Sequence, residues 1–133
     1  MYCTQADMQA RFGENELVQL TDRERTGSVN GDVLDTAIAD ASAEIDGYLA
    51  GRYSLPLPVV PSALTLYACD IARYRLYEDG AYEQVIERYK IAVAYLRDLA
   101  QGKILLPGIG EDDREDNAAG FAINRKVFTG GGF

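Results

Sequence analysis

The sequence predicts an all-α fold: a small helical bundle of two short N-terminal helices and three longer helices, followed by an extended C-terminal arm. Two stretches, about 33–50 and 82–101, repeat apolar residues on a period of 3.6. A third stretch, about 61–77, is apolar on nearly every side. A helix that is apolar all round lies at the centre of a bundle, so we expect this stretch to be the core helix.

The N-terminal third of the chain carries signals for two short helices. Thr4 followed by Asp7 resembles a capping box, and it predicts a helix that stops at Gly13. Residues 14–21 predict a second short helix, and the polar, turn-rich residues 22–31 predict a surface loop.

The long helix 33–50 is expected to begin at an Asp32 cap and to end at Gly51. The seven apolar residues that share one of its faces are Leu34, Ala37, Ile38, Ala41, Ile45, Tyr48 and Leu49. Prolines exclude a helix over residues 52–60, whereas Pro61 fits the first turn of the next helix.

The last two helices are expected to form a hairpin, because only a short turn around Gly80 separates them. The inward face of the final helix carries Val85, Tyr89, Ala92, Val93, Leu96, Leu99 and Ala100, and Gly102 closes the helix. The charges of the core helix have local partners at helical spacing. This spacing predicts the ion pairs Asp70–Arg73 and Arg75–Asp79.

Size and composition predict one domain over residues 1–110 and an acidic linker with an arm over residues 111–133. The net charge of −8 argues against a specific nucleic-acid-binding surface. No apolar run approaches the roughly 20 residues that span a bilayer, so no membrane association is expected. The N-terminus has no secretion signal, which predicts a protein made and kept in a cytoplasm.

Catalytic, cofactor and metal sites are not expected. The chain has no histidine and lacks phosphate-cradling and nucleophile motifs. Cys69 is interpreted as a core residue, and a disulfide with Cys3 is not expected. Asp40 and Glu44 stand one turn apart, but a solvated helix face is favoured over an acid–base pair. The acidic run 111–116 is interpreted as a solvated linker in preference to a cation site.

Nine tyrosines leave two interpretations open. They are either partly buried rings with a solvated hydroxyl, or part of a protein–protein interface, where tyrosine is enriched. The arm also leaves two interpretations open. Its apolar residues belong either to a frayed end or to a segment that orders on a partner protein; they are Phe121, Ile123, Val127, Phe128 and Phe133.

The central stretch resembles a family of virion proteins of Mu-like phages and prophages. The matching segments are IDGYLAGRY at 45–53, LPL at 55–57, Pro61 and DIARY at 70–74, with a YCT start at 2–4 and VFT at 127–129. Members of this family look like the helical head–tail connector proteins of long-tailed phages. The resemblance therefore implies an all-α, non-enzymatic adaptor of the virion neck, assembled in the host cytoplasm.

The resemblance also implies partners: a portal protein above, a stopper or tail-completion protein below, and further copies of the chain in a dodecameric ring whose lumen DNA passes through. We place the portal contact on Phe121, Ile123, Val127, Phe128 and Phe133. Arg52 and Tyr53 are candidates for contact between subunits, with packing at the helix end as the alternative. Other neck roles (stopper or tail terminator) and a small acidic regulatory module remain alternative functions.

Overall fold

The computed structural model describes residues 1–77 and 79–111, and all regular elements within these residues are helices. In chain order they are α1 (Gln5–Phe12), α2 (Glu14–Thr21), α3 (Gly31–Leu49), α4 (Ser62–Leu76) and α5 (Glu83–Ala100). The predicted all-α bundle of two short and three longer helices is confirmed. Except for Glu111, the predicted linker and arm lie outside the described residues.

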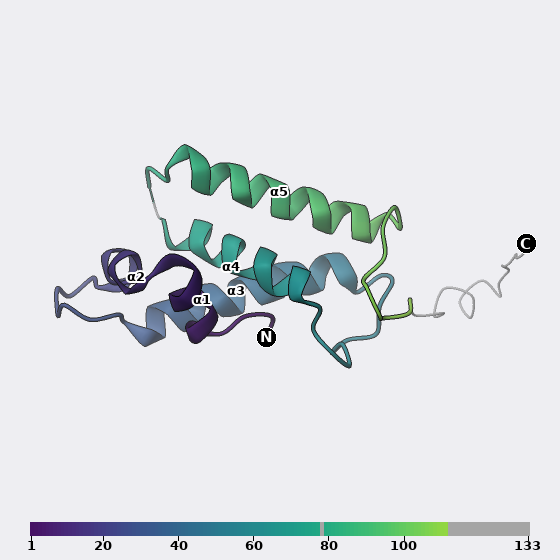
Figure 1. Cartoon of the computed structure of the whole chain (residues 1–133), viewed down its shortest axis with the longest axis horizontal. Coiled ribbons are helices and arrows are strands. Elements are labelled where there is room, and N and C mark those ends of the chain that lie inside the picture. Colours follow the sequence, from purple (N-terminus) through teal and green to yellow (C-terminus); the bar gives the residue numbers. More distant parts are fainter. Residues whose placement is uncertain (78, 112–133) are drawn as a thin grey trace, which may run out of the picture.

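The first two helices follow their sequence signals. Thr4 accepts a hydrogen bond from the Asp7 amide, and the Asp7 carboxylate accepts one from the Thr4 amide, which confirms the capping box. Gly13, with φ of +87°, ends α1 and lets the chain turn directly into α2. The two helices pack against α3 and α4 on one side of the bundle (Figure 1).

The predicted cap of α3 was wrong by two residues. The amide oxygen of Asn30 accepts hydrogen bonds from the backbone N–H groups of Asp32 and Val33, so Asn30 is the cap and the helix begins at Gly31. The Thr21 hydroxyl accepts a bond from the Asn30 amide and donates to the Leu17 carbonyl, which fixes the start of α3 to the end of α2.

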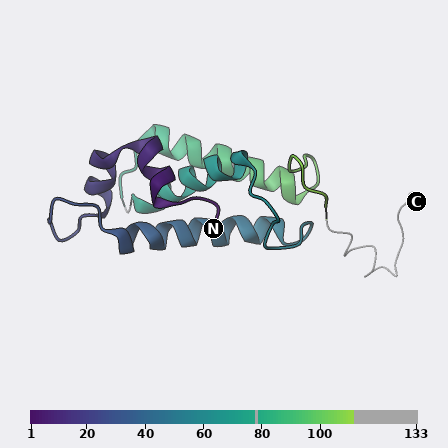
Figure 2. The ribbon, with the colours of Figure 1, turned by 60° about the horizontal axis from the view of Figure 1, so that its bottom comes forward.

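Helix α4 occupies the centre of the bundle, as its sequence predicts. It packs against α3 on one side and α5 on the other, and it also contacts α1 (Figures 1 and 2). Pro61 precedes the first residue of the helix instead of lying within its first turn. Seven of its residues are buried, namely Leu64, Ala68, Cys69, Asp70, Ile71, Ala72 and Leu76.

The α4–α5 hairpin is confirmed, and stacked tyrosines join its two helices. The rings of Tyr74 and Tyr89 are nearly parallel with centroids 4.0 Å apart, and those of Tyr67 and Tyr95 are 4.5 Å apart.

Cys69 is buried in the core and is a free thiol, as is Cys3. None of the described helices is both long and apolar enough to cross a membrane.

Candidate functional site

Arg52 and Tyr53 lie at the corner where α3 ends and the chain turns toward α4. The backbone N–H groups of Arg52 and Tyr53 both donate to the Leu49 carbonyl, so helix-like hydrogen bonding continues past the end of α3. The Tyr53 side chain is only 1% exposed, and its hydroxyl accepts a hydrogen bond of 3.1 Å from the Leu106 amide. Because Leu106 is itself buried, this contact fixes the segment after α5 onto the end of α3.

Arg52 holds the same segment from outside. Its Nε donates to the Ala100 carbonyl at 2.9 Å, which satisfies one of the free carbonyls at the end of α5. Its Nη1 lies 3.4 Å from Glu111 Oε2 in an ion pair. The guanidinium covers Gly102, where a Cβ atom would lie 2.8 Å from Arg52 Cζ.

Gly102 reverses the chain between these contacts. It adopts φ of +75°, and its amide donates to the Leu99 carbonyl while the Lys103 amide donates to the Asp98 carbonyl. This pair of bonds is the Schellman arrangement, in which glycine is favoured at the left-handed position. The chain then runs back across the end of the bundle, past the end of α3 (Figure 1).

We name Arg52, Tyr53, Gly102, Leu106 and Glu111 together the arm anchor. Its contacts hold the described chain, up to Glu111, against the end of the bundle. The five residues predicted to contact a portal lie outside the described residues. The contact between subunits predicted for Arg52 and Tyr53 remains a prediction. The structure gives both residues a role in helix-end packing.

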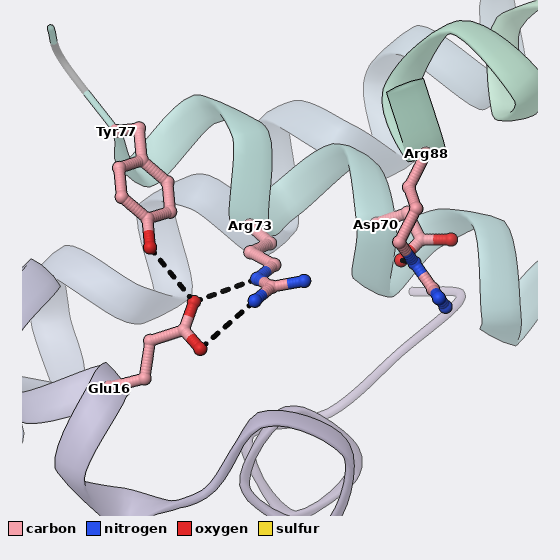
Figure 3. Close-up of polar contacts among 5 residues, drawn as sticks. All are labelled: Glu16, Asp70, Arg73, Tyr77 and Arg88. Carbon is pink, nitrogen blue, oxygen red and sulfur yellow. Dashed lines mark hydrogen bonds and ion pairs between the residues drawn. The ribbon is translucent and has the colours of Figure 1, made fainter. Parts of the chain in front are cut away.

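A second polar cluster ties α2, α4 and α5 together (Figure 3). Both carboxylate oxygens of Glu16 accept bonds from Arg73, from Nε at 2.7 Å and from Nη2 at 3.0 Å. The Tyr77 hydroxyl donates to the same carboxylate at 3.1 Å, and the Arg73 guanidinium lies 4.4 Å from the centroid of the Phe12 ring. Burial, and then the charge of Glu16, raise the pKa of Tyr77.

Asp70 is the acid at the centre of the bundle, 5% exposed, and Arg88 of α5 pairs with it at 2.9 Å (Figure 3). The predicted local pair Asp70–Arg73 was therefore wrong. Packing places a partner for each group on a neighbouring helix: Arg88 of α5 pairs with Asp70, and Glu16 of α2 pairs with Arg73. A buried carboxylate needs such a partner to remain charged.

The second predicted local pair, Arg75–Asp79, was also wrong. Arg75 Nη2 lies 2.5 Å from Glu44 Oε1, and the Tyr89 hydroxyl donates to the other oxygen of Glu44 at 3.1 Å. The prediction of a solvated face holds for exposed Asp40 but was wrong for Glu44, whose carboxylate is engaged by α4 and α5. These bonds occupy the carboxylate that an acid–base pair with Asp40 would use.

Within residues 1–77 and 79–111, no group of three or more Cys, Asp and Glu side chains is placed to hold a metal ion. The arrangement of charged groups is that of ion pairs between helices.

The Bacteriophage Mu Gp36 family matches residues 2–124, which is nearly the whole chain. This chain belongs to the Gp36 family. It is 42% identical to gene product J of Escherichia phage Mu over 104 residues, covering 77% of this chain and 73% of that protein. It is 34% identical to the Mu-like prophage FluMu protein gp36 of Haemophilus influenzae over 113 residues, covering 85% and 79%.

The match confirms the predicted resemblance to proteins of Mu-like phages and prophages. It covers all five helices and the arm anchor of this Gp36-family chain, and it continues to residue 124. The matched region of this chain therefore includes the corner at which Arg52 and Tyr53 hold the segment after α5.

Sequence reasoning missed the partners of the anchor in this Gp36-family chain. Arg52 reaches Glu111 across 59 positions, and Tyr53 reaches Leu106 across 53. Gly102 was the one local signal, because a glycine after a helix marks a reversal of the chain. It did not indicate which corner the reversed chain would reach.

Proposed function

We propose that this protein is a head–tail connector, an adaptor that forms a ring between the portal of the phage head and the neck proteins nearer the tail. In this role it is a structural protein of the virion without catalytic activity. Its family of Mu-like phage proteins and its all-α bundle support the proposal. The ring is a dodecamer, assembled in the host cytoplasm, with a stopper or tail-completion protein bound below it.

The observation that carries the proposal is the arm anchor. Residues 112–133 start from a fixed point at one end of the bundle, beside Arg52 and Glu111. An extended chain advances at most 3.3–3.6 Å per residue, so this segment reaches up to roughly 75 Å from the anchor. The body can therefore stay in a ring while the arm binds a neighbouring protein. We assign portal binding to the arm's large apolar side chains, Phe121, Ile123, Val127, Phe128 and Phe133.

The net negative charge of the chain supports a ring whose channel DNA crosses without binding to it. The chain has a formal net charge of −8, and attraction to phosphates needs lysine and arginine on the facing surface. A ring of such chains presents DNA with a surface that repels it weakly, which suits passage of the genome through the lumen.

Mass photometry of the protein mixed with the portal ring of its phage tests the proposal. The full chain is expected to form a large complex with portal, and a chain truncated after residue 116 is expected to form none. The truncated chain retains all five helices and the anchor, so its circular dichroism should match that of the full chain.

A second variant keeps the length of the arm and replaces Phe121, Phe128 and Phe133 with serine. Its matched control replaces Asn117, Asn124 and Thr129 with serine. Loss of the complex with the first variant alone assigns binding to the aromatic residues. Unchanged binding by the truncated chain overturns the assignment to the arm, and binding to purified tails but not to portal overturns the connector role in favour of a stopper or terminator.

A further inference from the structure

The outer face of α5 carries charged side chains that the bundle does not use. Lys90 and Arg97 are exposed there, and neither side chain forms a hydrogen bond or ion pair with another described residue. Arg73 and Arg88, by contrast, are each paired with a carboxylate on another helix. Ile91 follows Lys90 on the exposed side of α5 and is 54% exposed, the most exposed large aliphatic side chain in any described helix.

The outer face of α3 has the opposite charge. Every charged residue of this helix is acidic. Asp35, Glu44 and Asp46 accept hydrogen bonds from Gln5, Arg75 and Tyr2 within the chain. The carboxylates of Asp32 and Asp40 accept none from any described residue, and both residues are exposed.

We infer that neighbouring copies of this chain contact each other through these faces, with residues 90–97 of α5 of one copy against α3 of the next. The inference deepens the proposed function, because it rests on the ring and names the surfaces that build it. Residues 83–89 of α5 are excluded from the contact, since Glu83 and Glu87 are exposed there and would repel the acids of α3.

The spacing of the charges fits. At a rise of 1.5 Å per residue, Lys90 and Arg97 are separated by about 10.5 Å along α5, and Asp32 and Asp40 by about 12 Å along α3. The difference between the two separations is small enough for the long, flexible lysine and arginine side chains to span. Between the two acids the exposed residues are Asp35 and Thr36, whose side chains are both short, so Ile91 of the other copy meets little steric obstruction.

The two helices lie on different sides of the bundle (Figure 2), so the two faces are unlike surfaces of the chain. A contact between unlike faces is heterologous, and it closes into a ring when the rotation between copies divides a full turn. A contact of one face with itself would stop at a dimer. The pairing of α5 with α3 is therefore of the type that a connector ring requires.

Charge reversal tests the contact in the complex with portal. Lys90→Glu/Arg97→Glu and Asp32→Lys/Asp40→Lys are each expected to lower ring formation at least about tenfold, the factor that 1.4 kcal/mol produces. The quadruple variant restores opposite charges and is expected to recover ring formation. Arg11→Glu/Lys103→Glu, which changes the net charge as Lys90→Glu/Arg97→Glu does but away from both faces, is expected to form the ring normally.

Cross-linking tests the same contact in the free protein, without portal. Thr36→Cys and Ala94→Cys variants are mixed at high concentration and treated with a short bismaleimide. We expect a dimer with one copy of each variant, whereas the wild-type chain, whose two cysteines are buried, gives none. Ala10→Cys on exposed α1 is the control partner and should not cross-link to either variant.

The outcomes separate the two proposals. A portal complex that forms equally with every charge variant, together with equal cross-linking to Ala10→Cys, overturns the contact and leaves the connector role standing. Specific cross-linking that the charge reversals abolish, without any binding to portal, supports the contact and overturns the connector role.

Discussion

The two ends of the described chain are attached to the α3–α4–α5 core in different ways. The N-terminal helices are held by Glu16, whose carboxylate receives two bonds from Arg73, and the two side chains are only 21% and 15% exposed. The C-terminal segment is held by buried Tyr53 and by the Arg52–Glu111 pair, whose side chains are 32% and 35% exposed.

This difference separates stability from positioning. A short, bidentate and partly buried ion pair contributes to folding, whereas an exposed single contact at 3.4 Å contributes little. At the C-terminal corner the buried tyrosine supplies the stability, and the exposed pair positions Glu111 beside Arg52. The following experiments separate these contributions, starting with the largest effect.

Tyr53→Ala is expected to lower the free energy of unfolding by about 3–5 kcal/mol, because it removes a fully buried aromatic side chain. Tyr53→Phe keeps the ring and leaves only the Leu106 amide without its acceptor, so we expect a loss of about 1–2 kcal/mol. Urea unfolding followed by circular dichroism measures both. Equal losses for the two variants would contradict the view that the ring fills the core.

Arg73→Ala is expected to cost about 2 kcal/mol, since it leaves the partly buried Glu16 carboxylate without its bidentate donor. Arg97→Ala is the matched control. It removes an exposed arginine that has no partner among the described residues, and its effect should stay within about 0.5 kcal/mol. If the free energy of unfolding falls by the same small amount in both variants, the Glu16–Arg73 pair does not contribute to folding. The proposed difference between the two attachments would then be wrong.

The N-terminal attachment also predicts a loss of stability at high pH. Burial, and then the bond to Asp46, raise the pKa of Tyr2 above its usual value of 10.0. Folded Tyr2 therefore keeps its proton where the unfolded chain loses it, so this contribution is fully present below pH 10 and decreases as the pH rises toward the raised pKa.

Above pH 10 the free energy of unfolding should fall, and Tyr2→Phe should reduce the slope by up to about 1.4 kcal/mol per pH unit. Urea unfolding at a series of pH values between about 8 and 11 measures the slope, and neutral pH supplies the reference for the loss of the hydrogen bond itself. An unchanged slope in the variant would show that Tyr2 ionises normally in the folded protein.

The smallest effect is expected for Glu111→Gln. Removal of an exposed ion pair should change the free energy of unfolding by less than about 0.5 kcal/mol. The direction of the arm should nevertheless change. A distance measured by spin labels between the turn at Gly80 and a cysteine placed at position 117 should broaden in the variant. A narrow, unchanged distribution would show that Tyr53 alone directs the arm.

The helices could be predicted from the sequence because their signals are local. The apolar period placed α3 and α5 to within two residues at each end, and the capping box placed α1. The cap of α3 was misassigned because Asn30 and Asp32 are both good caps, and the bond from the Asn30 amide to Thr21 that favours the first is a tertiary contact.

The partners of the charged residues could not be predicted. Helical spacing predicted that Arg73 pairs with Asp70, three residues away. In the folded chain Arg73 pairs with Glu16, which is 57 positions distant in the sequence and is held in place by packing. The position of Tyr53 just after a helix also did not predict whether its side chain points into the core. Which way a side chain points from a corner depends on where the reversed chain after Gly102 lies.

The arm anchor lies at one end of the elongated bundle, and the α4–α5 turn and the loop before α3 lie at the other (Figure 1). Any assembly that keeps the long axes of its copies parallel therefore has two chemically unlike rims. One rim carries every arm anchor, and the other carries Gly80 and its neighbours. Such an object is polar along its axis, so it can bind one structure on one side and a different structure on the other, and a label at Gly80 reports which way it is inserted.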